Sequence, residues 1–359
     1  MKLNASDVQI ISLGAHVLGG GGGGPAARGL RSAREAFELG CVELAELSSL
    51  PDESLVVTVS GVGAPSRTTS MYTSVHYLRA LELMEEALKC PIAGFIPSEM
   101  GANAAFGPML PAAARSVPLL NAACDGRAHP LGTMGSLGLA SDPLYQTIQV
   151  ACGGLRENGT YTELVATGSV TTTAKLCRNA ADLAGGRAVV VRNPVTVGYL
   201  REHGAVGCYT QAMGLGRAMS AVSPALRPQA AAEYMGGRIA ACGTVTEFSL
   251  LSESGLDHGS CNVTASADCF HLTFYNEFMT MEHGAERLAT FPDLITVFDR
   301  STGAVLNTAD LQNGMEVAVL TVPRQRLLLS SGVRDSTLYE DLERIVRREM
   351  RTFVSDILL

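Results

Sequence analysis

Short apolar runs alternate with helical patterns in the first part of the chain, and this alternation constrains the fold more than any other feature of the sequence. Parallel neighbours in a sheet need a crossover connection, which is usually a helix packed on one face. We therefore predict that residues 1–165 form an α/β layer domain with a parallel sheet covered on both faces. The strands are expected at residues 55–60, 92–96 and 118–120, and the helices that separate them at 72–89 and 103–115.

A run of six glycines, Gly19–Gly24, lies between two segments that read as helices, 4–17 and 26–39. Such a loop carries no side chains, so its backbone N–H groups can approach an anionic or strongly polar ligand closely. It is not a P-loop, because no Lys-Ser or Lys-Thr follows, and the helix in front of it argues against a dinucleotide-binding fingerprint. A flexible turn is the alternative interpretation.

The pattern changes after Thr162, where strands follow one another with few helices between them. In Phe270–Phe278 apolar and polar residues alternate, which favours antiparallel strands with one buried face. We predict a mostly β domain over residues 166–330, interrupted by a helical stretch at 211–241. Residues 331–359 are expected to supply an amphipathic helix, at 337–353, that docks back on the first domain. The strands of this half are expected at 163–166, 188–192, 245–251, 270–278, 295–298 and 317–322.

The charge balance and the N-terminus exclude several classes of protein. With 27 basic and 35 acidic residues the net charge is -8, so no long-range field draws the chain to nucleic acid or anionic lipid. The N-terminus lacks the charged-then-apolar order of a secretory signal, and no apolar run is long enough to cross a membrane. The 9 cysteines form no CxxC pair. We expect a soluble cytoplasmic protein, and the apolar composition favours a homo-oligomer.

Polar residues gather where the predicted strands end, which is where open α/β sheets bind their ligands. The three strand ends are 61–66 (GVGAPS), 97–103 (PSEMGAN) and 121–130 (NAACDGRAHP). Glu99 and Asp125 are the candidates for general base and acid, because a carboxylate at a strand end can be desolvated and shifted toward neutral pH. As an alternative, each caps the helix or turn that follows it.

Other residues near these strand ends are candidates for binding or proton transfer. Arg127 offers a bidentate fork for a carboxylate or a polarised carbonyl, with an ion pair to a neighbouring acid as the alternative. His129 is a proton shuttle, a metal ligand or a hydrogen-bonded loop histidine. Cys124 is a candidate thiol nucleophile, although burial is the favoured interpretation. His16 and His76 are additional histidine candidates, for which a structural role is favoured.

Several motifs together resemble the family named for S-methyl-thiohydantoin desulfurase. The resemblance implies a three-layer α/β N-terminal domain and a mostly β, barrel-like C-terminal domain. Two departures from the family pattern are Met100, where a second glycine is usual, and His129, where an aromatic residue is common. The motifs are LGGGGGGP at 18–25, GVGAP at 61–65, PSEMGANA at 97–104, CDGRAHP at 124–130, FYNEF at 274–278 and FPDLI at 291–295.

The chemistry that the resemblance implies is hydrolysis of a hydantoin-like five-membered ring, in which water attacks the carbon bearing an S-methyl group and a thiol leaves. Glu99 or Asp125 is expected to be the base, with His129 as the third catalytic candidate. A divalent metal is a further option, with Asp125, His129, His16 or Glu99 as ligands, and no other cofactor is expected. The residues expected to bind the substrate are Gly20, Gly21, Gly22, Gly23 and Gly24, which stabilise charge, Asn103 and Arg127, which orient the ring, and Asn276 and Glu277, which close the site from the second domain.

Family members also resemble partners of hydantoinase and oxoprolinase chains, so a hydantoinase-type protein partner is expected beside the small-molecule ring substrate. The alternative function is a non-catalytic subunit that binds a small anion or assists assembly of such an enzyme. A nucleotide-dependent ligase or kinase is a third, weaker interpretation.

Overall fold

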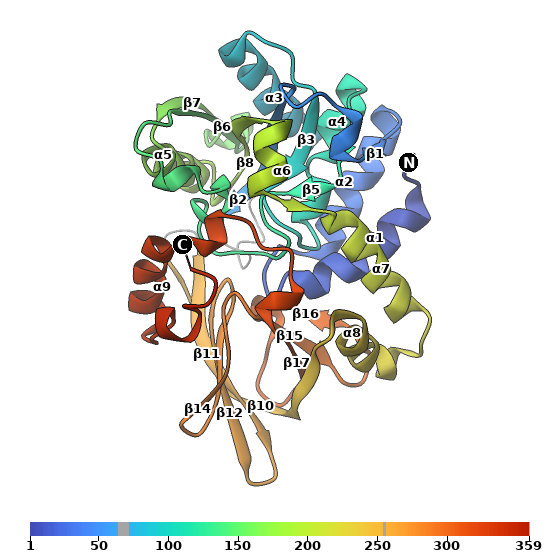
Figure 1. The fold of residues 1–359 in the computed structure, drawn as a ribbon, viewed down its shortest axis with the longest axis vertical. Helices are drawn as coiled ribbons and strands as arrows, with labels where there is room; N and C mark the ends of the chain where they lie inside the picture. The colour runs from blue at the N-terminus through green and yellow to red at the C-terminus, as the bar shows by residue number, and fades with distance from the viewer. Residues whose placement is uncertain (64–71, 254–255, 359) are drawn as a thin grey trace.

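The computed structural model describes residues 1–63, 72–253 and 256–358, and two β-sheets organise this part of the chain (Figure 1). The first sheet has the order β1-β4-β3-β2-β8-β6-β7. It is parallel from β1 to β2 and antiparallel from β2 to β7, so the predicted parallel sheet is only part of a mixed one. Its strands are β1 (Leu44–Ala45), β2 (Leu55–Gly63), β3 (Gly94–Pro97), β4 (Leu119–Leu120), β6 (Thr147–Gly153), β7 (Thr162–Gly168) and β8 (Arg187–Thr196).

The strands at 163–166 and 188–192, which we predicted in the second domain, lie in the first sheet as β7 and β8. In β8 the run Ala188–Val191 is buried on both faces. Val189 and Val191 belong to the core under α3 (Ser74–Leu88), whereas Ala188 and Val190 pack with α5 (Val170–Leu183). A central strand of this kind needs an apolar residue at every position, so its sequence does not alternate as an edge strand of a β domain would. The change of pattern near residue 165 therefore does not separate the two sheets.

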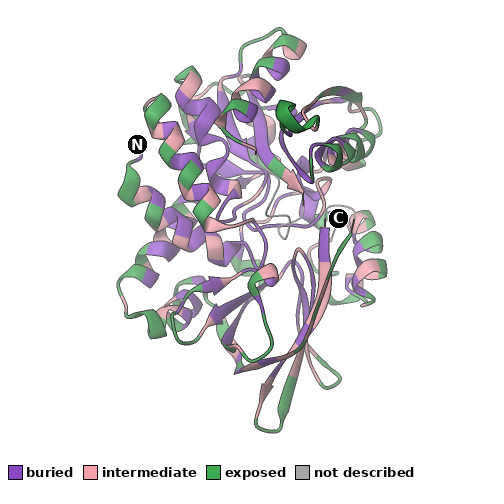
Figure 2. Ribbon diagram, turned by 180° about the vertical axis from the view of Figure 1, so that it is seen from behind, coloured by how far each residue is buried: buried purple, intermediate pink, exposed green. Residues whose placement is uncertain are grey.

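Helices cover both faces of the first sheet, as predicted (Figures 1 and 2). The predicted helices at 4–17 and 26–39 are confirmed, and Asn4 caps the first by accepting hydrogen bonds from the backbone N–H groups of the first turn. This first helix packs against α7 so closely that a side chain at Gly14 would lie 1.9 Å from the Ala212 carbonyl oxygen. The helices are α1 (Ala5–Leu18), α2 (Ala26–Leu39), α3 (Ser74–Leu88), α4 (Met109–Arg115), α5 (Val170–Leu183), α6 (Val197–His203), α7 (Cys208–Ser220), α8 (Arg227–Met235) and α9 (Tyr339–Val346).

The second sheet is antiparallel throughout and has the order β14-β13-β12-β11-β10-β17-β15-β16. In the described residues no pairing closes it, so the expected barrel is not found, although the β-rich composition of this half is. Figure 2 shows the inner strands buried and the outer hairpin ends exposed. Its strands are β10 (Arg238–Glu253), β11 (Leu256–Ala265), β12 (Asp268–Tyr275), β13 (Glu277–His283), β14 (Glu286–Thr290), β15 (Leu294–Asp299), β16 (Val305–Leu306) and β17 (Glu316–Val322), and a separate ribbon pairs β5 (Ala122–Ala123) with β9 (Ala205–Val206).

The C-terminal helix is shorter than predicted and lies mainly on the second sheet. It ends at Val346, because Arg347 takes a left-handed conformation with φ of 52°. Its buried face, which includes Tyr339 and Leu342, shares a cluster with Phe291 and other residues of the second sheet. Met134, from the loops of the first sheet, joins the same cluster. The helix therefore closes the junction between the sheets and does not pack on the first sheet alone.

The glycine run is also part of this junction. The Gly20 carbonyl accepts a hydrogen bond of 2.8 Å from the Phe278 backbone N–H, at the start of β13. The Gly21 carbonyl accepts one of 2.8 Å from Thr308. Carbonyl groups of this loop thus bind the second sheet. No helix in the described residues is long and apolar enough to cross a membrane.

Candidate functional site

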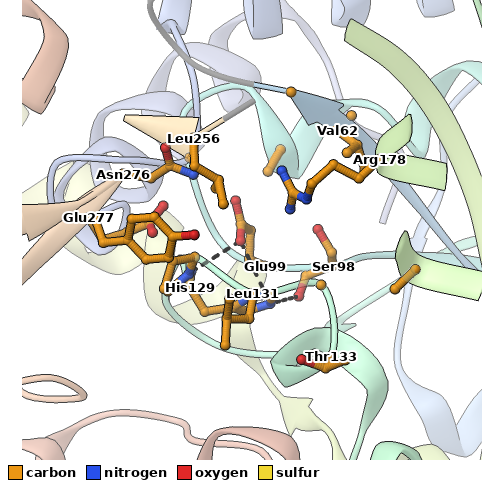
Figure 3. Close-up of a pocket in the computed structure, with 18 of the residues that line it drawn as sticks. Val62, Ser98, Glu99, His129, Leu131, Thr133, Arg178, Leu256, Asn276 and Glu277 are labelled. Carbon is orange, nitrogen blue, oxygen red and sulfur yellow. Dashed lines mark hydrogen bonds and ion pairs between the residues drawn. The ribbon is translucent and has the colours of Figure 1, made fainter. Parts of the chain in front are cut away.

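A pocket of about 440 Å³ lies where the strand-end loops of the first sheet face the second sheet (Figure 3). Its floor is formed by the loop after β3 and the loop after β5, and α5 and β8 form one wall. The opposite wall comes from the ends of β11, β12 and β13 and from α9. Pockets of this size at the junction of two domains are common sites for small molecules.

Backbone hydrogen bonds hold the two floor loops side by side. The Cys124 N–H donates to the Pro97 carbonyl over 3.0 Å, and the Asp125 N–H donates to the Ser98 carbonyl over 3.2 Å. The Met100 N–H in turn donates to the Asp125 carbonyl over 3.1 Å. These bonds extend the sheet past its strand ends, so the side chain of Glu99 is held beside the second loop.

Glu99 and His129 meet on this floor. The His129 backbone N–H donates to Glu99 Oε2 over 3.2 Å, and His129 Nε2 lies 3.3 Å from the Ser98 carbonyl oxygen and 3.7 Å from Glu99 Oε2 (Figure 3). Burial raises the pKa of Glu99 to about 7, against the opposing effect of the His129 hydrogen bond and the Arg192 charge. Burial and the Arg192 charge lower the pKa of His129 to about 4. At neutral pH His129 is therefore uncharged, and Glu99 is divided between its two protonation states.

Glu277 faces the same space from the start of β13, beside Asn276 (Figure 3). It is buried, and its pKa is raised well above the ordinary value, first by burial and then by the Glu99 charge. The glycine run makes room for it, because a side chain at Gly22 would lie 1.9 Å from Glu277 Oε1. Gly23 supplies a backbone N–H to the carboxyl group. The pocket thus holds two desolvated carboxyls, of which the buried Glu277 keeps its proton more firmly than the partly exposed Glu99.

Among the described residues, four cations line the pocket on the side formed by α5 and β8. Lys175 and Arg178 come from α5, and Arg187 and Arg192 come from β8. Figure 3 shows the Arg178 guanidinium pointing into the pocket from the side away from Glu277 and Asn276. Arginine keeps its proton at every accessible pH and binds carboxylates through two parallel hydrogen bonds. The pocket therefore combines carboxyls and cations, with Arg178 on the side away from Glu277 and the Arg192 charge acting on Glu99.

The two cations of β8 were missed in the sequence, because this strand was assigned to the other domain. Arg187 begins the strand and Arg192 lies within it, and together they bracket the apolar run AVVV. Both are buried, with 5% and 4% of their surface exposed. A charged residue in a strand whose other positions are apolar must be paired or must face a ligand, and that signal was present in the sequence.

Asp125 does not line the pocket. Its side chain is fully buried behind the floor, where Oδ1 accepts a hydrogen bond of 2.8 Å from the Ser330 backbone N–H. Burial raises its pKa to about 7. The sequence placed this carboxyl at a strand end but could not show that the segment around Ser330 covers it. Asp125 thus fastens that segment to the floor loop and does not reach the pocket.

Arg127 is likewise behind the pocket, with no exposed surface. Its Nη1 donates to the Pro292 carbonyl over 3.1 Å and to the Asp293 carbonyl over 2.6 Å, and its guanidinium lies 4.5 Å from the centre of the Phe291 ring. Arg127 therefore clamps the two halves of the molecule together. It acts on the pocket through its charge, which lowers the pKa of Glu277 against the effect of burial.

The other predicted binding residues divide between the pocket and its surroundings. Gly23, Gly24, Asn103 and Asn276 line the pocket, whereas Gly20, Gly21 and Gly22 pack against neighbouring chain. Asn103 Nδ2 donates to the Tyr72 hydroxyl over 3.2 Å, and Asn276 Oδ1 accepts from the Asp257 backbone N–H over 2.9 Å.

The remaining candidates lie outside the pocket. His16 bonds Asn307 over 3.2 Å, and His76 bonds the Gly154 carbonyl over 2.8 Å. Cys124 is buried 3.1 Å from the Thr58 hydroxyl, and burial raises its pKa to about 11, so it is not a thiolate at neutral pH. Residues 64–66 of the first strand end lie outside the described residues. Within the described ranges no group of three His, Cys, Asp or Glu residues is placed to hold a metal ion.

Replacing Asp125 by Asn tests its position. The pKa of Asp125 in the fold lies above that of a carboxyl in the unfolded chain, so its contribution to stability is full below the ordinary carboxyl pKa and is lost as pH rises through about 7. We expect Asp125→Asn to raise Tm by about 5 °C at pH 8 and to leave it unchanged near pH 4. Thermal unfolding across this range measures the effect, and a variant with unchanged Tm at pH 8 would contradict it.

Two family models match most of the chain. One, described as S-Me-THD-like, N-terminal domain, matches residues 6–155, and the other, described as S-Me-THD-like, C-terminal domain, matches residues 169–332. Among solved structures, the crystal structure of a protein from Chromobacterium violaceum is similar with a TM-score of 0.72 and 20% identity over 96% of each chain. At that identity the likeness shows the fold alone. No curated protein matches the chain.

Proposed function

The chain belongs to the S-Me-THD-like family, and we propose that it is a hydrolase that removes a thiol from a hydantoin-like five-membered ring, as in the conversion of an S-methyl-thiohydantoin to a hydantoin. The observation that carries this proposal is the pair of desolvated carboxyls, Glu99 and Glu277, whose pKa values are raised to different extents in one pocket. Such a pair supplies a base and an acid at the same pH.

In this mechanism water adds to the ring carbon that bears the S-methyl group. Ionised Glu99 takes one proton from the water as the C–O bond forms, and protonated Glu277 gives its proton to the ring nitrogen that receives the C=N electron pair. The C–S bond then breaks with its electron pair on sulfur, the C–OH becomes C=O, and methanethiol leaves. The two glutamates regain their starting states by exchange with solvent. One water is consumed, and one thiol and one hydantoin are formed.

The neighbouring groups support these roles. Uncharged His129 keeps Glu99 in place through its backbone N–H and does not compete for the proton, because its pKa is lowered to about 4 by burial and Arg192. The cations of α5 and β8 would bind an anionic substituent of the ring at the far end of the pocket. His129 is therefore a positioning residue in this proposal, whereas the base is Glu99.

Thiol release tests the proposal. Purified protein is expected to release thiol from S-methyl-thiohydantoins, and a chromogenic disulfide measures this release. For rings that carry an acidic substituent, kcat/KM is expected to be at least about tenfold higher than for rings that lack one, because the cations of the pocket bind the substituent. Absence of thiol release from all of them would contradict the proposal. If the same rings nevertheless raise Tm in a saturable way, a non-catalytic anion-binding subunit is the better interpretation.

A further inference from the structure

Tyr72 lines the pocket but has no part in the mechanism above. It lies just before α3 and is half-buried. Its hydroxyl accepts the hydrogen bond of 3.2 Å from Asn103 Nδ2, and Asn103 follows Glu99 in the same floor loop. A side chain at Gly61 would lie 2.5 Å from this hydroxyl, so the absence of one leaves the hydroxyl room at the pocket wall.

Groups that favour the phenolate surround Tyr72. The Arg28 guanidinium lies 5.0 Å from the centre of its ring. Burial on its own would raise the pKa of Tyr72, but the charges of Arg28 and Arg187, together with the Asn103 hydrogen bond, hold that pKa below its ordinary value. The contrast is Tyr77, whose ring meets that of Tyr72 edge-on at 5.6 Å and whose pKa burial raises well above the ordinary value. Of these two neighbouring tyrosines, the one in the pocket is the better acid.

We propose that Tyr72 is a further catalytic residue, the acid that protonates the departing thiolate. This inference rests on the proposed hydrolase function. As the C–S bond breaks, its electron pair stays on sulfur and the Tyr72 O–H proton passes to it, which forms the thiol. The C–OH proton of the intermediate then passes through water to the Tyr72 phenolate as the carbonyl forms. Tyr72 thus ends each cycle as a phenol: the thiol carries the proton that Tyr72 gave, and the second proton of the attacking water replaces it on Tyr72.

The chemistry has a place for such a group, because in this mechanism Glu99 returns to solvent the proton that it takes from water. Glu277 gives its proton to the ring nitrogen in the addition step, and an alkyl thiolate is a basic leaving group that departs slowly without a proton. A phenol with a lowered pKa, whose anion is stabilised by Arg28, Arg187 and Asn103, is suited to this second transfer.

The leaving group itself tests this role. Tyr72→Phe is expected to lower kcat by about 100-fold on an S-methyl ring and by less than about threefold on the same ring with an S-trifluoroethyl group, because trifluoroethanethiolate is a much weaker base and leaves without a proton. An equal loss on both rings would reduce Tyr72 to a structural role, and no loss on either would also overturn the inference. An unchanged affinity for the hydantoin product shows that the variant keeps its fold.

A direct titration provides a second readout that does not depend on turnover. The difference in phenolate absorbance between the unmodified protein and Tyr72→Phe reports the pKa of Tyr72, which is expected below that of free tyrosine and higher in Arg28→Met. A pKa of Tyr72 above that of free tyrosine would overturn the inference. If the unmodified protein releases thiol from neither ring, the proposed hydrolase function is wrong and the role of Tyr72 is wrong with it. If the unmodified protein releases thiol and Tyr72→Phe releases it equally fast, only the role of Tyr72 is wrong.

Discussion

Replacing Glu99 by Gln is expected to lower kcat by about 100- to 10,000-fold and to change KM by less than about threefold. Gln has nearly the same shape and can still accept the hydrogen bond from the His129 backbone N–H, so the floor of the pocket should keep its geometry. It cannot take a proton from water. A loss confined to kcat would therefore separate the base from a residue that only holds the substrate.

The same residue predicts how the reaction depends on pH. The active form of Glu99 is the carboxylate, and its pKa is raised to about 7 by burial. The ionised fraction increases about tenfold between pH 6 and pH 8, so kcat/KM should increase by the same factor and then level off. A rate that falls across this interval would mean that the protonated form is active and that Glu99 is the acid.

Glu282→Gln is the matched control for this substitution. The Glu282 and Glu99 side chains have the same exposed fraction, 15%, but Glu282 lies in the second sheet and pairs with Arg287 and Arg348. Its neutralisation should leave kcat within about twofold, because no proton transfer passes through it. A comparable loss in both variants would show that the effect comes from removing a buried charge and not from catalysis.

Local patterns in the sequence were enough to predict strands β2, β3 and β4 of the first sheet and the helices beside them. The apolar run of β2 and the capped helix α1 carry their signals within a few residues, and both appear close to their expected bounds. The position of Glu99 could also be predicted, because a strand end in an α/β sheet determines which edge its side chain reaches. These features are determined by residues that are close to one another in the sequence, so they can be predicted without knowledge of the tertiary fold.

Long-range pairing could not be predicted in the same way. β8 joins β2 across more than a hundred residues, and its apolar run is compatible with a strand buried in either half. With β8 misplaced, the buried arginines of this strand could be recognised as unusual but could not be placed at the pocket. Asp125 shows the same limit, because the segment that buries it follows about two hundred residues later along the chain. Burial at these positions is a property of the tertiary fold.

Arg127→Met is expected to destabilise the protein by about 3–5 kcal/mol, which corresponds to a fall in Tm of roughly 5 °C for a chain of this length. The guanidinium donates to the carbonyls of Ala128, Pro292 and Asp293 and has no exposed surface. A methionine fills a similar volume but leaves these buried carbonyls without their donor. It also removes a positive charge that lowers the pKa of Glu277, so Glu277 should hold its proton more firmly.

Arg344→Met is the control. Arg344 forms an ion pair with Asp341 at the surface, where the Arg344 side chain is 75% exposed and the Asp341 side chain 67% exposed. Removing that pair should change the free energy of unfolding by less than about 1 kcal/mol. The two outcomes for Arg127 also decide between its interpretations. A large fall in Tm identifies the clamp between the two halves, whereas an unchanged Tm with a raised KM would return Arg127 to the substrate-binding role that its place beside Asp125 first suggested. Because Arg127 does not line the pocket and its Nε and Nη1 donate to three backbone carbonyls, the first outcome is the one that its geometry favours.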